Sequence, residues 1–597
     1  MESKKVLHMS LVGSGGDGVM ATANMILKTA AKMGFYGMMA QSYGPQIRGG
    51  ESAAHVSIGA EPVRVTNPKK DLVICFRFAD VTRFAKELSV GPGACVLHGK
   101  EEGELPSILK SEGGVTLPIP FQEILEKEGL PEIAKNVLVF GMFLHLLGWE
   151  LKHGSACIRE VFGHKSSAVI SSNLKAMEVG FSSLESVTLP FQCPKPQKAV
   201  ERKLFSGNEA CARGAVDAGC RFFAGYPITP SSEILEEIYD LLPKVGGKLI
   251  QGEDEIASLG MVVGASYGGV PAMTATSGPG LSLMTEMLGL SSIAEIPVVI
   301  VDCQRAGPST GIPSRTEQSD LWHALYGGHG DFPRVVLAPT DVKDCFQTMH
   351  RAFYLSETYQ IPVLVLSDAL IAQRLEIMDP VDASGFPHGK RLLAKPPFEN
   401  YQRFDLQIGY AGGSGTGVNP VAIPGTPEGM HSIAGIEHTE KGTPSSDGDQ
   451  HQIMNQKRFL KLKTIAKETA PWYSIQGSAK ADHALITWGS CAGVAEEYLL
   501  HHPETALFVP QILEPFPVEG LQKFLKDKKS VTVLEMNHQG QFYHHLRALG
   551  LLDEGKSAVS ARRSGGLPFK VEDLEQMMKK TMDYEKDNGP WTIYHGL

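Results

Sequence analysis

The chain alternates between short apolar runs and longer amphipathic ones. Six runs have the length and apolar content of buried strands: residues 5–13, 297–303, 361–368, 483–490, 505–512 and 530–537. Three others have a helical pattern: residues 255–269, 341–357 and 571–586. Strands that alternate with helices predict parallel sheets with right-handed crossovers. We therefore expect a multi-domain α/β protein.

Composition divides this α/β chain into parts. A segment with Pro and Lys, residues 189–203, separates an N-terminal domain at 1–188 from a second domain at 204–376. Residues 377–477 are rich in Gly, Pro and Ser, which indicates either a functional loop or a surface that contacts a partner. Residues 478–597 return to the α/β pattern. The length of 597 residues fits several domains, since one domain takes roughly 150 residues.

One stretch, residues 225–235, places a hydroxyl between two prolines in front of an amphipathic helix. Residues 219–225 have a strand pattern, and Pro227 and Pro230 exclude a helix interior. Thr229 is therefore expected at the N-cap, with Pro230 at the first helical position. Open α/β sheets bind ligands at such turns, where parallel strands end. A well-capped helix with no ligand is the simpler alternative.

Three further stretches place groups that could bind a ligand at helix starts or strand ends. Residues 253–255 are consecutive acids that either cap a helix or offer a carboxylate to a cofactor. The turn at Ser277 and Gly278 lets a ligand approach the backbone closely, although a plain turn explains it nearly as well. Arg305 follows a buried strand, where it either binds a carboxylate bidentately or lies at a loop edge.

A glycine-rich turn follows the first strand, and Gly13, Gly15 and Gly18 satisfy the pattern G-x-G-x-x-G. A dinucleotide site also needs an acid at the end of the second strand, about 20 residues later. The next acid is Glu51, well past that strand, so NAD binding is disfavoured. A turn that packs helix on strand, or holds another phosphate, remains open. The Gly-Asp-Gly at 16–18 lacks the later Asn of a thiamine diphosphate–magnesium motif.

Charge and cysteine spacing exclude several classes of protein. The formal net charge of −10 gives no basic face for nucleic acid or an anionic membrane. The most apolar long stretch, residues 136–149, is too short to span a bilayer, and the N-terminus does not resemble a secretory signal. Nine cysteines without any C-x-x-C argue against zinc ribbons and ferredoxin-type clusters in this chain. Reduced cytoplasmic thiols are the simplest explanation.

Five stretches together resemble one family. "GYPITPSSE", "GEDEIASLG", "TATSGPG" and "QRAGPSTGIPSRTEQ" are similar to the α subunit of 2-oxoacid:ferredoxin oxidoreductases, and "GSGGDGV…SYGPQIRGG" resembles the γ domain of the same enzymes. The resemblance covers nearly the whole chain in a fused γ–α arrangement. It implies a γ-type α/β domain on the coenzyme A side, then a thiamine-diphosphate-binding-like parallel α/β domain. A transketolase C-terminal-like α/β domain would follow.

The resemblance also implies roles for residues of these motifs. Thr229 would reach the substrate and the thiamine beside it, and Arg305 would bind the 2-oxo carboxylate. Glu255 would face the aminopyrimidine of thiamine diphosphate. Arg315 is the candidate for a distal substrate carboxylate. The remaining expected contacts are Tyr226 and Ser314 with the substrate, Ser277 and Gly278 with the cofactor, and Arg48 with coenzyme A.

The activity implied is thiamine- and coenzyme A-dependent oxidative decarboxylation of a 2-oxoacid. "VAIPGTPEGMHSIAGIEHTEKG" and "GGHGDFPRVVLAPTD" are most like the 2-oxoglutarate branch, which forms succinyl-CoA, CO2 and reduced ferredoxin. A Ser stands at 314 where that branch often has Thr, so a hydroxyl is kept and a methyl is lost. A β subunit would supply the diphosphate–Mg2+ site and at least one [4Fe–4S] cluster, in a (γα–β)2 heterotetramer.

Three alternatives remain. The same chemistry can act on pyruvate or on a branched-chain or aromatic 2-oxoacid. A transketolase-like transferase would share the thiamine chemistry, but it needs a complete diphosphate motif in its own chain. A non-catalytic scaffold subunit would tolerate alanine at Thr229, Glu255 and Arg305 together.

Overall fold

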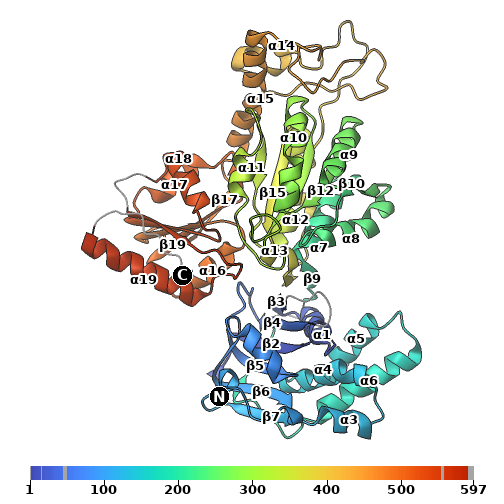
Figure 1. The fold of residues 1–597 in the computed structure, drawn as a ribbon, viewed down its shortest axis with the longest axis vertical. Helices are drawn as coiled ribbons and strands as arrows, with labels where there is room; N and C mark the ends of the chain where they lie inside the picture. The colour runs from blue at the N-terminus through green and yellow to red at the C-terminus, as the bar shows by residue number, and fades with distance from the viewer. Residues whose placement is uncertain (1, 15, 45–49, 198–199, 553–556, 589–597) are drawn as a thin grey trace. The chain divides into compact units, whose positions relative to one another are not determined.

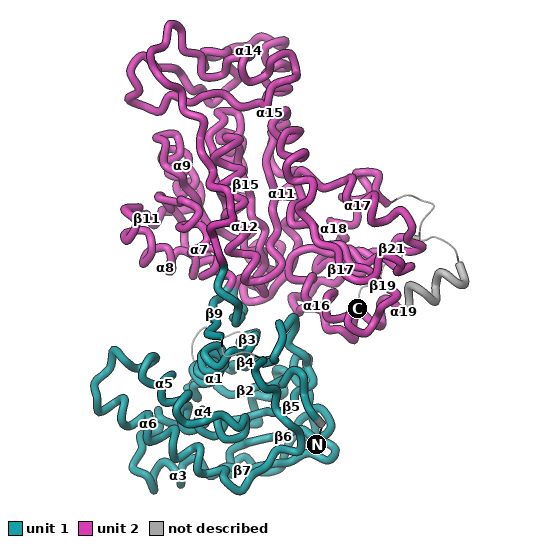
Figure 2. Tube along the Cα trace, turned by 180° about the vertical axis from the view of Figure 1, so that it is seen from behind, with its two compact units in different colours: residues 1–206, 373–381 teal, residues 207–372, 382–597 magenta. Residues whose placement is uncertain are grey.

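The computed structural model describes residues 2–14, 16–44, 50–197, 200–552 and 557–588. Within these ranges no helix is long and apolar enough to cross a membrane. The chain forms two compact units, drawn in different colours in Figure 2. Unit 1 comprises residues 1–206 and 373–381, and unit 2 comprises residues 207–372 and 382–597. The finer domain boundaries expected from composition stay predictions.

Unit 1 is built on a mixed sheet that has eight strands in the described residues. Their order is β7 (Val115–Ile119), β6 (Ser89–Gly99), β5 (Lys69–Cys75), β2 (Val6–Ser14), β4 (Glu51–Gly59), β3 (Tyr36–Tyr43), β16 (Leu375–Met378) and β9 (Lys203–Ser206). The first four are mutually parallel, and antiparallel pairing begins at β4. The expected first strand is confirmed as β2. Strand β16, between β3 and β9, was not predicted, since it returns to unit 1 from far along the chain.

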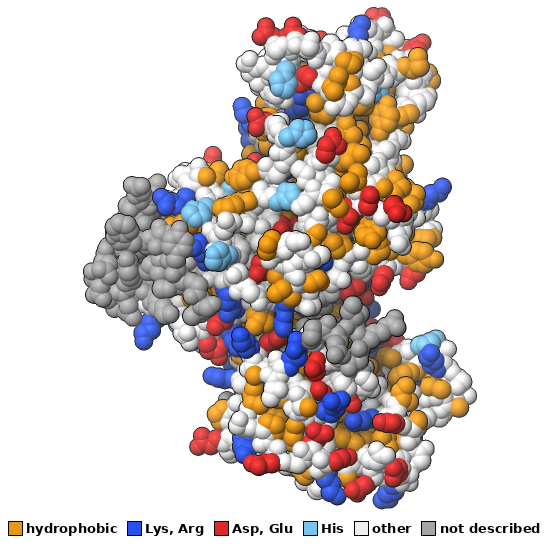
Figure 3. Space-filling view, in the orientation of Figure 1, with side chains coloured by type: hydrophobic (Ala, Val, Ile, Leu, Met, Phe, Trp, Pro, Cys, Tyr) orange, Lys and Arg blue, Asp and Glu red, His pale blue; other side chains and the backbone are white. Residues whose placement is uncertain are grey.

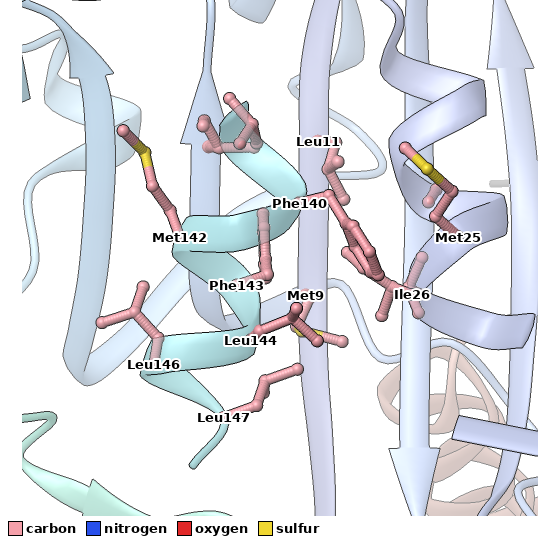
Figure 4. Packing of buried hydrophobic residues seen from close by; sticks show 14 of the residues in the cluster. Met9, Leu11, Met25, Ile26, Phe140, Met142, Phe143, Leu144, Leu146 and Leu147 are labelled. Atoms are coloured by element: carbon pink, nitrogen blue, oxygen red, sulfur yellow. The ribbon is translucent and has the colours of Figure 1, made fainter. Parts of the chain in front are cut away.

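The core of unit 1 lies between this sheet and helices α1 (Val19–Met33) and α4 (Lys135–Leu146), as Figure 4 shows. The apolar stretch that is too short for a membrane forms α4, which is buried on nearly every side. It crosses α6 (Ser167–Ser182) closely, because Gly141 and Gly180 lack side chains. A Cβ atom at Gly141 would lie 2.0 Å from the carbonyl oxygen of Met177. This stretch therefore serves the packing of helix on helix.

The glycine-rich turn of unit 1 is closed by a carboxylate of its own chain. Asp17 accepts a hydrogen bond from the Ser14 N–H at 2.8 Å and pairs with Lys135 at 3.2 Å. Gly18 precedes α1 with a φ of 72°, in the left-handed region that favours glycine. Gly15 lies outside the described residues. Because β4 separates β2 from β3, this turn does not join neighbouring parallel strands, which favours the packing alternative.

Unit 2 contains the predicted parallel sheet (Figure 1). In the described residues its strand order is β11 (Lys248–Gln251), β10 (Phe222–Gly225), β12 (Ala272–Thr276), β13 (Val298–Gln304), β15 (Pro362–Asp368), β14 (Val335–Leu337) and β20 (Ile512–Glu514). Only β20, at one edge, runs antiparallel to its neighbour. One face of the sheet packs against α9 (Glu255–Tyr267), α10 (Gly278–Ile293) and α11 (Leu321–Tyr326). The opposite face meets α7 (Gly207–Asp217), where the Cys303 thiol contacts Asn208.

A second sheet of unit 2 forms the C-terminal part of the chain. Its order in the described residues is β17 (Tyr473–Gly477), β19 (Thr505–Pro510), β18 (His483–Thr487), β21 (Ser530–Glu535) and β22 (Ser557–Arg562). The three strands expected here are confirmed as β18, β19 and β21, and the final helix as α19 (Val571–Asn588). One apolar cluster joins both sheets of unit 2, so they share a core.

The expectation of weak structure across residues 377–477 is wrong for α15 (Gly448–Glu468), a helix of 21 residues. Its buried face carries Lys457 and Lys461, which both pair with the buried Glu295 at the end of α10. Charged residues at core positions hide the apolar period on which a sequence-based prediction depends. The helix is instead recognised by its N-cap, where Asp447 accepts a hydrogen bond from the Gln450 N–H.

The predicted N-cap at Thr229 is also wrong. Helix α8 spans Ser232–Leu241 and its N-cap is Ser231. The N–H and the hydroxyl of Ser231 both donate to the carbonyl oxygen of Ile228, at 2.9 and 3.0 Å. This bonding closes a turn that includes Thr229 and Pro230, so the helix begins after it. Thr229 is left exposed at the tip of the turn.

Candidate functional site

Four strand ends meet at one edge of the parallel sheet of unit 2. Strands β11, β10, β12 and β13 are parallel, so their carboxyl ends share that edge. The backbone ties two of these ends together, since the Gly252 N–H donates to the Gly225 carbonyl oxygen at 2.9 Å. Each of the motifs singled out in the sequence of this domain begins here. In open α/β sheets this is the edge at which ligands bind.

Thr229 and Arg305 come together at this edge. Nη1 of Arg305 donates a hydrogen bond to the backbone carbonyl oxygen of Thr229 at 2.6 Å. The Arg305 residue is only 6% exposed, and its Nε has no hydrogen-bond partner among the described residues. Burial lowers the pKa of Arg305, and the nearby Asp320 acts in the opposite direction. The guanidinium therefore keeps one buried N–H donor without a partner among the described residues.

The three consecutive acids at the start of α9 have different environments. Asp254 is the N-cap, and its side chain accepts a hydrogen bond from the Ala257 N–H at 2.7 Å. Glu253 precedes the helix and is exposed. Glu255, the first residue of the helix, is 5% exposed and shares the buried face with Leu259 and Val262. Of the three, only Glu255 presents a buried carboxylate.

The turn after β12 brings its backbone against two carboxylates. A Cβ atom at Gly280 would lie 2.6 Å from Oε1 of Glu255, and a Cβ atom at Gly278 would lie 2.6 Å from Oδ2 of Asp320. A side chain at either position would therefore displace the carboxylate that lies against it. Ser277, the N-cap of α10, has a fully buried hydroxyl without a hydrogen-bond partner in the described part of the chain. The Ser277 hydroxyl next to the glycine backbone of residues 278 and 280 suits a ligand that approaches the turn.

The loop after β13 is folded back beside Arg305. The N–H of Ala306 donates to the Arg315 carbonyl oxygen at 2.9 Å, and the Arg315 N–H donates to the Ile312 carbonyl oxygen at 3.0 Å. Ser314 is exposed within this loop. The Arg315 side chain is half-buried against Gly566, where a Cβ atom would lie 2.3 Å from the Cβ of Arg315. The loop thus places both predicted substrate residues next to the Arg305 end of the strand.

Two aspartates that sequence reasoning missed lie at the same edge. Asp302 is the fifth residue of β13, and Asp320 immediately precedes α11. Burial and the charge of Asp320 raise the pKa of Asp302 well above its ordinary value. Burial also raises the pKa of Asp320, to about 6. An Asp within the apolar run "PVVIVDC" was the available signal, because a charged side chain is rarely buried without a partner.

Of the other predicted contacts, the structure describes Tyr226 but not Arg48. Tyr226 is 41% exposed at the same turn as Thr229. Arg48 lies outside the described residues. The nine cysteines are free thiols, and the described residues contain no group of three or more His, Cys, Asp and Glu side chains that could hold a metal ion. The binding roles of the site residues stay predictions.

Two family models match the chain. Residues 213–456 match "Pyruvate flavodoxin/ferredoxin oxidoreductase, thiamine diP-bdg", and residues 8–183 match "Pyruvate ferredoxin/flavodoxin oxidoreductase". The first match includes Thr229, Glu255 and Arg305. The second covers most of unit 1.

Individual proteins of known name are similar over most of their length. The 2-oxoglutarate synthase subunit KorA of Methanocaldococcus jannaschii is 37% identical over 378 residues, 63% of this chain and 98% of that protein. The 2-oxoglutarate oxidoreductase subunit KorA of Mycobacterium tuberculosis is 30% identical over 613 residues, 96% of this chain and 90% of that protein.

A solved structure extends this similarity to the fold. The 2-oxoglutarate:ferredoxin oxidoreductase of Magnetococcus marinus, with 2-oxoglutarate, coenzyme A and succinyl-CoA bound, matches with a TM-score of 0.89 and 33% identity. The match covers 97% of this chain and 100% of that one.

Proposed function

The chain belongs to the 2-oxoacid:ferredoxin oxidoreductase family, a family of oxidoreductase enzymes, and from this premise we propose that it is the fused γ–α subunit of a 2-oxoglutarate:ferredoxin oxidoreductase. The reaction is the oxidative decarboxylation of 2-oxoglutarate with coenzyme A to succinyl-CoA and CO2, with ferredoxin as the electron acceptor. The observation that carries the proposal is the buried Arg305, which is held against Thr229 and keeps an unpartnered Nε donor.

Recognition of the substrate is assigned to the two arginines of this edge. Arg305 binds the 2-oxo carboxylate, because its planar fork pairs bidentately with a carboxylate. Arg315 follows on the folded-back loop and binds the distal carboxylate, with Ser314 beside it. Thr229 and Tyr226 lie on the facing turn and contact the middle of the substrate. A second cation on the same loop, at Arg315, favours a dicarboxylate over pyruvate.

The residues around Glu255 fit the aminopyrimidine end of thiamine diphosphate. The buried carboxylate of Glu255 lies beside the backbone of Gly280, which has no side chain. Ser277, whose hydroxyl has no hydrogen-bond partner in the described residues, precedes Gly280 by three residues. Thiamine diphosphate, when bound, supplies a nucleophilic carbon and an electron sink for decarboxylation. Glu255 holds a proton at the ring nitrogen that faces it. Ser277 and Gly278 line the approach of the ring.

A partner subunit is expected to complete the site. The turns, helices and loop that form the site carry several exposed apolar side chains: Tyr226, Ile256, Leu283 and Ile312, at 41%, 46%, 49% and 48% exposure. Figure 3 shows hydrophobic side chains exposed over the α9 and α10 region of unit 2. Apolar surface around a catalytic edge favours a subunit interface. The partner is a β subunit that holds the diphosphate with Mg2+ and at least one [4Fe–4S] cluster, in a (γα–β)2 assembly.

Two further assignments complete the proposal. Coenzyme A is held on the side of unit 1 with the help of Arg48, by similarity to the γ domain of the family. The protein works in the cytoplasm, where thiols stay reduced, and its nine cysteines are free.

The proposal is tested by purifying the chain with its natural partner and measuring ferredoxin reduction with several 2-oxoacids. We expect the highest kcat/KM with 2-oxoglutarate, dependent on coenzyme A. A preference for pyruvate, or for a branched-chain or aromatic 2-oxoacid, would keep the chemistry and change the substrate. Aldehyde transfer without any acceptor reduction would contradict the oxidoreductase assignment.

A further inference from the structure

The loop that carries Arg315 is held at its far end by the C-terminal sheet of unit 2. Gln318 is fully buried, and its N–H donates to the Met536 carbonyl oxygen at 2.7 Å. Its Oε1 accepts from the Met536 N–H at 2.9 Å, and its Nε2 donates to the Trp488 carbonyl oxygen at 2.8 Å. Met536 directly follows β21 and Trp488 directly follows β18, so two strand ends of that sheet bind one residue of the loop.

The end of a third strand, β22, leads to Arg315 itself. The chain turns there at Gly565 and Gly566, and the Gly565 N–H donates to Oε1 of the buried Glu317 at 2.9 Å. Gly566 is buried, and a Cβ atom at this position would lie 2.3 Å from Cβ, 2.9 Å from Cγ and 3.4 Å from Cδ of Arg315. The backbone of the turn therefore lies along the aliphatic stem of Arg315.

The turn has its own supports. Nη1 of Arg563 pairs with Asp573 of α19 at 2.8 Å, and Nη2 donates to the Leu567 carbonyl oxygen at 3.1 Å. Gly566 has a φ of 75°, in the left-handed region that favours glycine. Residues 563–568 thus form a bonded turn, which offers Arg315 a fixed surface.

We propose that the turn 563–568 is a specificity element of the 2-oxoacid site, because it seats the stem of Arg315 so that the guanidinium meets the distal carboxylate of a dicarboxylate substrate. Gly566 and Glu317 are positioning residues that act through Arg315. A long side chain loses much rotamer freedom when it binds a ligand, and a stem already packed on backbone loses less. The inference rests on the proposed function for the role of Arg315.

The two arginines of the loop have separate supports. Arg305 is held by the Thr229 carbonyl oxygen on the turn after β10. The backbone of Arg315 is bonded to Ala306, whereas its side chain lies against Gly566. A change in the turn therefore displaces the Arg315 side chain and leaves Arg305 in place. Pyruvate has no distal carboxylate, so its use should not depend on the turn.

The decisive variant is Gly566→Ala, in the chain assembled with its partner. The added methyl group takes the place of the Arg315 stem, so kcat/KM for 2-oxoglutarate should fall about tenfold, while that for pyruvate changes little. Gly550→Ala is the matched control, because Gly550 has a similar φ of 70° and a Cβ there would meet no described atom within 4 Å. It should keep the wild-type ratio of the two kcat/KM values. The inference is overturned if Gly566→Ala keeps that ratio too.

A second pair of variants acts from the other side of the contact. Should Gly566→Ala fail to fold, Glu317→Ala removes the acceptor of the Gly565 N–H. It should lower the ratio of kcat/KM for 2-oxoglutarate to that for pyruvate, and Glu317→Gln, which keeps an oxygen acceptor, should restore it. A wild-type ratio in Glu317→Ala would contradict the inference.

Tryptic cleavage after Arg315 needs no activity. A looser stem exposes this bond more often, so the cleavage product should form faster in Gly566→Ala than in wild type or Gly550→Ala. Equal rates in all three proteins would overturn the inference. Faster cleavage in Gly566→Ala, in an assembly whose wild type oxidises no 2-oxoglutarate, would support the seating of Arg315 and contradict the proposed function.

Discussion

Arg305 donates a hydrogen bond from Nη1 to the backbone carbonyl oxygen of Thr229 at 2.6 Å, which joins the loop after β13 to the turn after β10. The two residues are 76 positions apart in the sequence. The bond occupies one donor of the guanidinium and fixes its plane, while the buried Nε stays without a partner in the described residues. A side chain held in this way needs little reorganisation when a carboxylate arrives.

Arg305→Lys should impair the use of every 2-oxoacid. An ammonium is a point charge and cannot bond the Thr229 carbonyl and a substrate carboxylate with one planar group. Loss of a charge-assisted hydrogen bond costs about 1.5–3 kcal/mol, so kcat/KM should fall roughly 10- to 150-fold. Steady-state kinetics of the assembled complex measures this. Arg159→Lys, on the exposed face of α5 (Leu151–Val161), is the control. An unchanged kcat/KM for all 2-oxoacids would remove Arg305 from the site.

Arg315→Ala should affect one class of substrate. If Arg315 binds the distal carboxylate, kcat/KM for 2-oxoglutarate falls by about 10-fold or more, while the value for pyruvate changes little. Ser314→Thr is a milder companion that keeps the hydroxyl and adds a methyl group. Equal losses on 2-oxoglutarate and pyruvate would mean that Arg315 only supports the loop against Gly566.

The buried cluster of Glu295, Lys457 and Lys461 holds α15 in place. We expect Glu295→Gln to destabilise the protein more than Lys461→Met does. Lys457 and Lys461 hold the pKa of the fully buried Glu295 well below its ordinary value, although burial alone would raise it. At a pH below the pKa values of both lysines, Glu295→Gln leaves two buried cations without a counter-charge, which costs about 3–5 kcal/mol. Lys461→Met keeps the pair of Glu295 with Lys457, so its cost is smaller. Urea denaturation of both variants tests this order, and the reverse order would contradict it.

The same cluster predicts a pH dependence with a defined sign. Burial lowers the pKa of Lys461 to about 7 and that of Lys457 to about 8, against 10.5 in the unfolded chain. Between these values the unfolded state binds more protons, so the contribution of the cluster to stability increases with pH. The free energy of unfolding of wild type minus that of Lys461→Met should therefore increase from pH 7 to pH 10. No increase over this range would show that Lys461 stays charged in the folded protein.

Purified without its partner, the chain should carry no iron–sulfur cluster and show no activity. Its nine cysteines are free, eight of them are buried, and they have no cluster spacing. Iron and acid-labile sulfide analysis of the isolated chain measures this directly. A brown preparation with stoichiometric iron and sulfide would contradict the division of cofactors between the subunits.

Much of the fold was predictable because the strands of this chain are apolar and bounded by turn residues. The parallel sheet of unit 2 follows from that pattern. Helix α15 was missed because its buried face carries Lys457 and Lys461, whose partner Glu295 lies more than 160 residues away. The start of α8 was misplaced because the side chain and the N–H of Ser231 bond backward to Ile228, which the cap preferences of Thr and Pro do not reveal.

The candidate site was predictable where one residue type has a special role in a local motif. The family resemblance singled out Glu255 among the three consecutive acids, and Glu255 is the one of the three whose side chain is buried. Asp302 and Asp320 were missed, because each looks ordinary alone. Only the fold places them at one edge of the sheet, where the charge of Asp320 raises the pKa of Asp302.

The most direct test of the proposed site is the exchange rate of the thiamine C2 proton in the assembled complex. Glu255→Gln removes the carboxylate while preserving its shape, so folding and assembly with the partner should be unaffected. General acid–base catalysis contributes typically 10²–10⁴-fold, and we predict that exchange slows by about that factor. Glu253→Gln, on the exposed neighbour, should exchange at nearly the wild-type rate. Exchange at the wild-type rate in Glu255→Gln would contradict the assignment of Glu255 as the activating carboxylate.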